Sequence, residues 1–301
     1  MDNDYKIVKR IKGFIKNAKF KLDYKDLKIL PDDLGNKLIY DLIFEGKSCM
    51  VCRAGATEMR CVDEYLKNKT FSDRIRKEIR DLSGVFPANA DILEKFCKCY
   101  ISCMQDADVI SLWGVGAESK VVHEYCKGSA FTELHALEPY YFDAPWSAAL
   151  KDKKVLVIHP FSESIKKQYD QREKLFSNQD ILPEFAELHC IPSVQSIAGN
   201  VTGFTDWFDA LESMKNQIDH VDFDVAIIGA GAYGLPLAAY VKSIGKQAIQ
   251  MSGATQILFG IKGKRWDEHP VISKFYNDSW VRPLPSETPA QIHKVEGGSY
   301  W

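Results

Sequence analysis

The sequence lacks the features that would assign it to several common protein classes. No apolar run approaches the roughly 20 residues that span a bilayer, and the first residues lack the continuous apolar stretch of a signal peptide. Neither sign of charge is in large excess, because the net charge is −2 and the pI is near 6.4. These absences predict a cytoplasmic protein that does not bind nucleic acid.

The sequence also lacks a recognisable metal-binding cysteine pattern, although it contains eight cysteines. Cys49-x-x-Cys52 and Cys99-x-x-x-Cys103 are spaced like ligand pairs, but no second pair follows at zinc-ribbon spacing. Thiols within apolar segments of a chain without a secretion signal are typical of small buried side chains. We therefore expect the cysteines to be core residues.

Several catalytic motifs are missing as well. The sequence has no Gly-x-Ser-x-Gly nucleophile turn, no Gly-x-x-x-x-Gly-Lys-Ser/Thr phosphate loop and no His-Glu-x-x-His pair. Their absence argues against the common hydrolases, P-loop nucleotidases and metalloproteases.

Short apolar runs alternate with helical patterns along the chain, which is typical of a parallel sheet with helices on its faces. With 46% hydrophobic residues, the 301-residue chain can bury a large core. We predict an α/β fold with a Rossmann-like, mainly parallel sheet and helices on both faces. The predicted strands span 48–53, 107–114, 131–138, 154–159, 187–192, 223–229 and 247–251, and the predicted helices include 58–66, 92–104, 165–176, 205–217 and 235–244.

The predicted domain organisation is simple, because no repeat, low-complexity segment or clear linker is present. Residues 31–301 are expected to form one domain with halves of about 31–150 and 151–301. Residues 1–30 are predicted to form a basic amphipathic helical segment, with Ile7, Ile11 and Phe14 on its apolar face. Such a helix either packs on the domain or lies on an anionic membrane surface, here through residues 5–20.

The first candidate site motif is Arg53-x-Gly55-x-x-Glu58, which follows the apolar run 48–53. Open α/β sheets bind their ligands on the loops that follow their strands. A cation, a glycine and a carboxylate on such a loop predict a site for an anionic substrate.

The second motif is Gly229-x-Gly231-x-x-Gly234, between a predicted strand and a predicted helix. Glycines let the backbone approach a phosphate, and the helix N-terminus attracts it. A dinucleotide site would add an acidic residue about 20 positions later, and the segment 247–252 has none. The alternatives are a nucleotide-sugar diphosphate site, a tight packing turn, and an NAD- or FAD-dependent oxidoreductase.

The stretch 252–266 joins a glycine-containing turn to a basic cluster. Its candidate binding residues are Ser252, Gly253, Gln256, Lys262, Lys264 and Arg265. Lysine and arginine can grip a diphosphate, and Trp266 beside them can stack on a base or a sugar. The alternative is an exposed basic turn with Trp266 in the core.

His159 ends the predicted strand 154–159, where it can hydrogen-bond a phosphate or transfer a proton. A histidine satisfied by the backbone is the alternative. The segment 138–146 combines carboxylates with aromatic rings and is either a wall for a sugar or base or an aromatic core cluster.

The first motif resembles the Arg-x-Gly-Asp-Gly-Glu signature of GT-D-type bacterial glycosyltransferases, with Ala56 and Thr57 in place of its Asp and Gly. The segment 253–266 and the C-terminal Glu296-Gly297-x-x-Tyr300-Trp301 are similar to stretches of mostly uncharacterised proteins encoded in bacterial capsule and O-antigen loci. The resemblance runs from about residue 46 to the C-terminus. It implies a glycosyltransferase that moves a sugar from a nucleotide-diphosphate donor to a surface-polysaccharide intermediate, with retention at the anomeric centre.

GT-D enzymes hold a metal ion with their Asp-x-Glu pair, of which this chain keeps Glu58. Losing one carboxylate weakens Mg²⁺ or Mn²⁺ binding unless Glu138 or Asp143 replaces it. In a metal-free version, Glu58 orients or deprotonates the acceptor hydroxyl while Arg53 and the basic residues of 262–265 hold the phosphates. Both versions remain open, as does a non-catalytic nucleotide-sugar-binding subunit. The sequence does not identify the donor, the acceptor or the oligomeric state.

Overall fold

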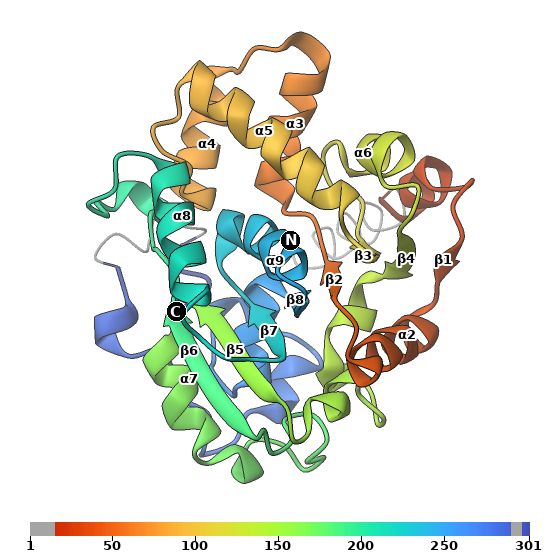
Figure 1. Cartoon of the computed structure of the whole chain (residues 1–301), viewed down its shortest axis with the longest axis vertical. Coiled ribbons are helices and arrows are strands. Elements are labelled where there is room, and N and C mark those ends of the chain that lie inside the picture. Colours follow the sequence, from red (N-terminus) through yellow and green to blue (C-terminus); the bar gives the residue numbers. More distant parts are fainter. Residues whose placement is uncertain (1–15, 290–296) are drawn as a thin grey trace, which may run out of the picture.

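The structure is a computed structural model that describes residues 16–289 and 297–301. Its described strands form one eight-stranded sheet in the order β1-β4-β3-β2-β8-β7-β5-β6, and every pairing in it is parallel (Figure 1). The predicted α/β fold is therefore confirmed. The strands are β1 (Ile29–Leu30), β2 (Cys49–Cys52), β3 (Val109–Leu112), β4 (Ala130–Glu133), β5 (Lys154–His159), β6 (Glu187–Pro192), β7 (Val225–Ile228) and β8 (Gln247–Gln250).

Helices connect most of these strands. They are α2 (Asp32–Glu45), α3 (Ala56–Asn68), α4 (Asp73–Ser83), α5 (Ala90–Gln105), α6 (Glu118–Tyr125), α7 (Ser162–Tyr169), α8 (Trp207–Ile218), α9 (Gly234–Ser243) and α10 (Thr255–Leu258). Among the described residues, no helix is long and apolar enough to cross a membrane. Of the predicted N-terminal segment, residues 16–23 are helical, and residues 1–15 lie outside the described part.

Two predicted elements end at least five residues earlier than expected. The predicted strand 131–138 stops at Glu133, and Leu134–Leu137 forms a 3-10 turn. The backbone N–H of Ala136 in that turn donates to Asp32 Oδ1 at 2.9 Å, so the chain bends toward the start of α2. The predicted helix 165–176 ends at Tyr169, after which a separate 3-10 turn follows.

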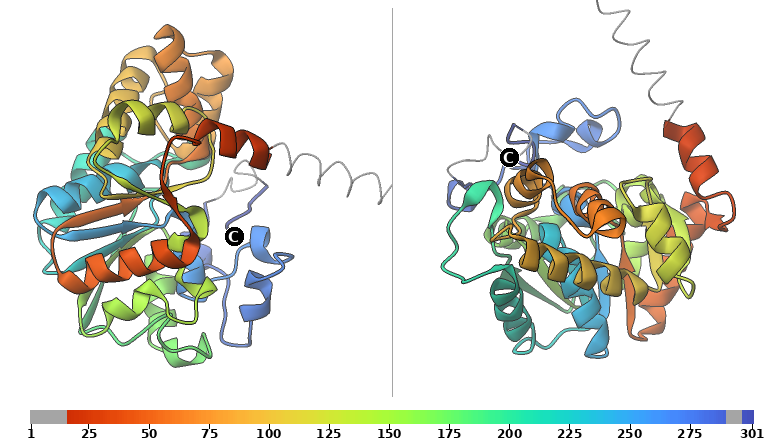
Figure 2. Two further views of the ribbon diagram at one scale, coloured as in Figure 1. Left: turned by 90° about the vertical axis from the view of Figure 1, so that its right-hand side faces the viewer. Right: turned by 90° about the horizontal axis from the view of Figure 1, so that it is seen from above.

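Side chains of each central strand alternate between two cores, one on each face of the sheet. In β7, Ala226 and Ile228 join the core formed with α3, α4, α5, α8 and α9, whereas Val225 and Ile227 join the core formed with α2 and α7. Figure 2 shows α2 and the group α3–α5 on opposite sides of the sheet. Burial on both faces explains why the strands are continuous apolar runs rather than alternating ones.

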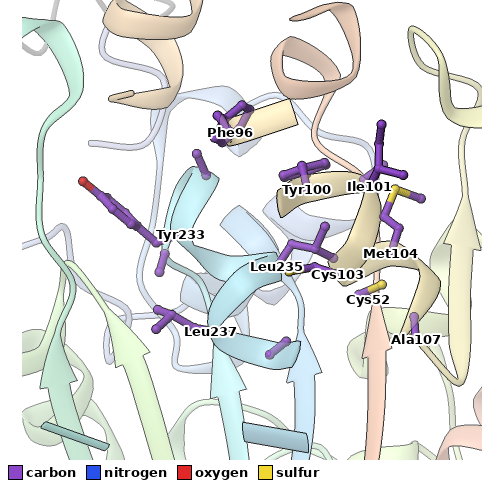
Figure 3. Close-up of a cluster of buried hydrophobic side chains, with 14 of the residues drawn as sticks. Cys52, Phe96, Tyr100, Ile101, Cys103, Met104, Ala107, Tyr233, Leu235 and Leu237 are labelled. Carbon is purple, nitrogen blue, oxygen red and sulfur yellow. The ribbon is translucent and has the colours of Figure 1, made fainter. Parts of the chain in front are cut away.

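The core on the α3–α5 side also positions aromatic residues near the edge of the sheet. Tyr100 of α5 and Tyr233, which precedes α9, belong to this core together with Phe96 and Cys52 (Figure 3). Six of the eight cysteines are buried and the other two are half-buried. The expectation that cysteines contribute to the core is thus met by most of them.

The centre of the sheet joins the two halves of the sequence. Strands β1–β4 lie on one side and β5–β8 on the other, and the two groups meet where Val51 of β2 pairs with Ile249 of β8. Because all strands are parallel, their carboxyl ends lie at one edge. Loops from both halves of the chain therefore converge above the middle of the sheet, where open α/β sheets bind ligands.

Candidate functional site

Two adjoining cavities lie at this edge. The first, called the Arg53 cavity, has a volume of about 290 Å³ and contains the polar residues Arg53, Thr57, Glu58, Tyr100, Glu138, Gln250 and Arg265. The second, called the His159 cavity, has a volume of about 110 Å³ and is lined by His159, Ser193, Gln195, Gly229, Gln256 and Trp301 among others. Both linings include Leu82, Ser83, Gly231, Ser252, Gly253 and Tyr300. The shared residues join the cavities into one cleft.

Arg53 follows β2 and is fixed at the wall of its cavity. Its backbone N–H donates to Gln250 Oε1 at 2.9 Å, and its guanidinium carbon lies 4.4 Å from the centroid of the Trp113 ring. Among the described residues, the buried Nε of Arg53 has no hydrogen-bond partner. A buried donor without a partner costs about 1–3 kcal/mol. Arg53 also lines the cavity, and a cation in a cavity lining is typical of a site for an anion.

Glu58 lies in the first turn of α3, and its carboxylate folds back over Gly55. A Cβ on residue 55 would lie 2.0 Å from Glu58 Oε2, so a side chain there would displace the carboxylate from this position. Burial raises the pKa of Glu58, opposed by hydrogen bonds from its own backbone and Ser83 and by the charge of Arg53. Glu58 is 8% exposed and lines the cavity. A carboxylate whose pKa is raised toward neutrality is suited to accept a proton from a hydroxyl group.

Glu138 supplies a second carboxylate from the 3-10 turn after β4. Burial raises the pKa of Glu138, whereas the charges of Arg53 and His135 lower it. Tyr140 donates its hydroxyl to Glu138 Oε2 at 3.1 Å. The charge of Arg53 therefore acts on both carboxylates of the cavity.

His159 is the last residue of β5 and is 2% exposed. Burial lowers the pKa of His159 to about 3, so the ring is neutral at physiological pH. The backbone N–H of Phe161 donates to His159 Nδ1 at 3.0 Å, which leaves the ring hydrogen on Nε2. These features favour a neutral hydrogen-bond donor over a residue that exchanges protons.

Acidification should destabilise the fold through His159. In the unfolded chain the histidine takes up a proton below about pH 6.5, whereas the folded protein does so near pH 3, so stability falls as the pH drops between these values. The contribution of His159 to the free energy of unfolding should fall by about 1.4 kcal/mol per pH unit in this range. Urea unfolding at pH 7, 6 and 5 should show that the free energy of unfolding falls more steeply in the wild type than in His159→Gln, by about this amount. Equal slopes would contradict the prediction.

The turn after β7 contains the three glycines of the second motif, and they have different surroundings. Gly231 has φ +55°, lines both cavities and would meet nothing within 4 Å if it carried a Cβ. A Cβ on Gly229 would lie 2.5 Å from His159 Cδ2 and 2.7 Å from the Ser252 carbonyl oxygen. Gly234 faces the Gln250 side chain and is absent from both cavity linings. The motif therefore leaves room for a ligand beside Gly231.

The stretch 252–266 contributes some of its predicted binding residues to the cleft. Ser252 and Gly253 line both cavities, Gln256 lines the His159 cavity and Arg265 lines the Arg53 cavity. The structure does not bring Lys262 or Lys264 to either lining. Lys262 Nζ lies 5.3 Å from the centroid of the Tyr276 ring. Lys264 is exposed.

The C-terminal residues form one wall of the cleft. A Cβ on Gly253 would lie 2.4 Å from Tyr300 Cε1, so the tyrosine ring rests directly on this glycine. Gln256 Nε2 donates to the Tyr300 carbonyl at 3.1 Å, and the backbone N–H of Lys264 donates to the Trp301 carbonyl at 3.2 Å. Arg265 places its guanidinium carbon 4.7 Å from the centroid of the Tyr300 ring. The segment 253–266 and residues 297–301 thus form one structural unit.

The residues of the Arg53 cavity do not fit a resident divalent ion. Within residues 16–289 and 297–301, no three histidine, cysteine, aspartate or glutamate side chains are grouped as metal ligands. Ala56 is the first residue of α3 and lines the cavity without offering an oxygen. The carboxylate of Glu58 is directed at the start of its own helix and at Ser83. Hard cations require several oxygen ligands, and the carboxylates in this lining are Glu58 and Glu138.

Sequence reasoning missed several residues of the cleft. Tyr100 accepts the backbone N–H of Gly55 at 2.9 Å, and Gln250 holds Arg53. The loop 193–197 lines the His159 cavity and is tied to α4, because Ser196 donates its hydroxyl to the Gly84 carbonyl at 2.6 Å. Trp113 follows β3 and Gln250 ends β8, so the rule that ligands bind at strand ends could have predicted both as cleft residues. Tyr100 and Ser196 reach the cleft through tertiary packing, which leaves no local pattern.

Comparison with known proteins supports the fold. The chain matches no family model and no curated protein by sequence. A solved structure described as "The highly conserved domain of unknown function 1792 has a distinct glycosyltransferase fold" is 14% identical, with a TM-score of 0.51 over 90% of this chain and 96% of that chain. Another, "Selenomethionine substituted structure of domain of unknown function 1792 (DUF1792)", is 13% identical, with a TM-score of 0.48 over 78% and 82%. The first likeness shows that this chain has a glycosyltransferase-like α/β fold.

Proposed function

We propose that this protein is a glycosyltransferase that moves a sugar from a nucleotide-diphosphate donor to a glycan acceptor. The observation that supports this most is the cleft, in which Arg53, Glu58, the turn at Gly231 and Arg265 line one cavity. Cations, a glycine turn and a buried carboxylate meet there at the carboxyl edge of a parallel sheet.

The chemistry of sugar transfer explains this set of residues. When the bond between the anomeric carbon and the diphosphate breaks, the bonding electrons move to the phosphate oxygen, and negative charge accumulates on the leaving group. Fixed cations such as Arg53 and Arg265 stabilise that charge. The acceptor oxygen bonds to the anomeric carbon and releases its proton, and Glu58 is placed to orient the hydroxyl or take that proton. Ser252 and Gly253 line the space between the two cavities, where the diphosphate would lie.

The finer parts of the proposal rest on the sequence resemblances. A surface-polysaccharide intermediate as acceptor follows from the likeness of 253–266 and the C-terminal residues to proteins of capsule and O-antigen loci. The resemblance of the first loop implies retention of configuration, which requires the acceptor to attack on the face from which the diphosphate leaves. The proposed cytoplasmic site of action rests instead on the lack of a signal-peptide pattern and of a membrane-spanning run in the sequence, and the proposed membrane contact through residues 5–20 rests on the basic N-terminal segment. Its described end lies close to the cleft, because Lys16 Nζ is 5.6 Å from the centroid of the Trp113 ring, on which Arg53 also stacks.

A panel of nucleotide sugars tests the proposal. At a concentration 100 times its Kd, a ligand adds about 2.7 kcal/mol of stability, which corresponds to a rise in Tm of roughly 5 °C for a protein of this size. We expect one class of nucleotide sugar to produce such a shift and then to be consumed by slow hydrolysis or by transfer to an acceptor. No shift with any nucleotide sugar would contradict the proposal. A shift without hydrolysis or transfer would instead support a non-catalytic binding subunit.

The oxidoreductase alternative receives no specific support. The strand after the glycine turn, β8, ends in Gln250, whose oxygen is occupied by the backbone of Arg53. A dinucleotide site uses that strand end for an acidic residue that holds the ribose.

A further inference from the structure

The resemblance of the first loop to GT-D-type glycosyltransferases implies a metal ion in the Arg53 cavity, but this cavity already contains the cation of Arg53. On the basis of the proposed function, we infer that this site neutralises the donor diphosphate with the guanidinium groups of Arg53 and Arg265, without a divalent cation. Three features of the cavity carry the inference.

The first feature is the set of oxygen ligands. Ala56 removes one carboxylate of the Asp-x-Glu pair, and the remaining one, Glu58, is folded over Gly55 with its Oε2 within 2.0 Å of where a Cβ would stand. The described residues contain no three-ligand group to replace the pair. Glu138 is the nearest substitute from another loop, but its hydrogen bond from Tyr140 and its interaction with Arg53 already engage it.

The second feature is the position of Arg53. Its charge acts on both Glu58 and Glu138, so a cation is already present where a metal ion would have to approach these carboxylates. Stacking on Trp113 and the hydrogen bond from its backbone to Gln250 hold the arginine in place. A second cation placed beside it would be repelled at short range.

The third feature is the geometry of the guanidinium group. Its fork of N–H donors matches two phosphate oxygens at once, which a lysine cannot do. Arg53 lines the cavity, so its guanidinium group is available to an oxyanion there. Arg265 comes from the other half of the chain and lines the same cavity, so two guanidinium groups are available to one diphosphate.

This arrangement also gives Glu58 a different task from that of a metal ligand. Because the phosphates are held by arginines, the carboxylate is left to act on the acceptor. Its raised pKa suits that role better than metal coordination, which requires a fully ionised ligand.

Isothermal titration calorimetry with UDP, GDP, dTDP, ADP and inorganic pyrophosphate tests the inference. Each ligand is titrated into the full-length wild type once with EDTA and once with Mn²⁺. We expect at least one nucleoside diphosphate to bind with Kd values that agree within threefold in the two buffers. Binding that appears with Mn²⁺ and disappears with EDTA would overturn the inference and leave the proposed function intact.

Substitution of Arg53 provides a second measurement. In EDTA, Arg53→Met should weaken binding of the same nucleoside diphosphate at least tenfold, and Arg53→Lys should recover part of the loss. Lys274→Met, which removes an exposed cation outside both cavity linings, is the matched control and should bind as the wild type does. An Arg53→Met protein that melts cooperatively and binds like the wild type would overturn the inference. Absence of binding by any of the ligands in either buffer would contradict the proposed function and the inference together.

Discussion

Replacing Glu58 with glutamine is expected to reduce sugar transfer by about a thousandfold, the middle of the range for removing a general base. Glutamine has nearly the same shape, so it can remain folded over Gly55, but it cannot accept the proton of the acceptor hydroxyl. The diphosphate contacts of the variant are unchanged, so donor binding should stay within about threefold of the wild type. Glu58 is therefore predicted to act on the rate of transfer rather than on affinity for the donor.

Initial rates with saturating donor, together with calorimetric Kd values, separate the two effects. Asp63→Asn provides the control, because Asp63 lies in the same helix and pairs on the surface with Lys67 at 2.6 Å. That variant should transfer at the wild-type rate. In the wild type, transfer should also decline as the pH falls through the raised pKa of Glu58. A Glu58→Gln protein with wild-type kcat would remove Glu58 from the mechanism.

Changing Gly229 to alanine should destabilise the protein by about 2–3 kcal/mol and abolish donor binding, since overfilling a packed site carries a cost of this size. The added methyl group would meet the Ser252 carbonyl oxygen at 2.7 Å and the His159 ring at 2.5 Å. The backbone oxygen cannot yield without moving the turn at 252–253. That turn lines both cavities, so the clash deforms the space available to the diphosphate.

The third glycine of the same motif provides the contrast. Gly234→Ala would bring a methyl group to 3.2 Å from Gln250 Cγ, a side-chain atom that can shift. Alanine also has a higher helix propensity at this first residue of α9. We expect its stability to remain within about 0.5 kcal/mol of the wild type, as for benign substitutions, with donor binding retained. Thermal melts and nucleotide-sugar titrations of the two variants compare them directly. An equal loss of donor binding in the two variants would contradict this contrast and indicate that the whole motif binds phosphate.

The sequence predicted the central strands well because they are buried on both faces. The range 154–159 matches the buried strand β5 from end to end. The range 187–192 matches β6 equally well, although β6 lies at the edge of the sheet and is only partly buried. The edge strand β1 was missed because it has two residues, Ile29 and Leu30, which give no periodic pattern. Among the helices, α4 was not assigned, although Ser72 caps it with a hydrogen bond from Ile75 N–H at 3.2 Å.

For the site, the rule that ligands bind at strand ends placed Arg53, Glu58, His159 and Gly231 in one cleft. Proximity in sequence was a poorer guide, because Lys262 and Lys264 lie within three residues of Arg265 yet do not share its cavity. The same rule did not predict Tyr300. Its ring lies against Gly253, and its carbonyl accepts a hydrogen bond from Gln256. Such contacts depend on how distant segments pack, and a single sequence does not encode them in a local pattern.

The pairing of β2 with β8 bears on how this protein acquires its ligand site. Cys49 lies opposite Gln247, so the middle of the sheet closes only after most of the chain has been brought together. Parallel pairings between such distant segments form slowly, because the entropy of closing the loop is lost before the contacts are gained. During refolding, competence to bind a nucleotide should therefore emerge with the last kinetic phase, well after helical circular dichroism has recovered.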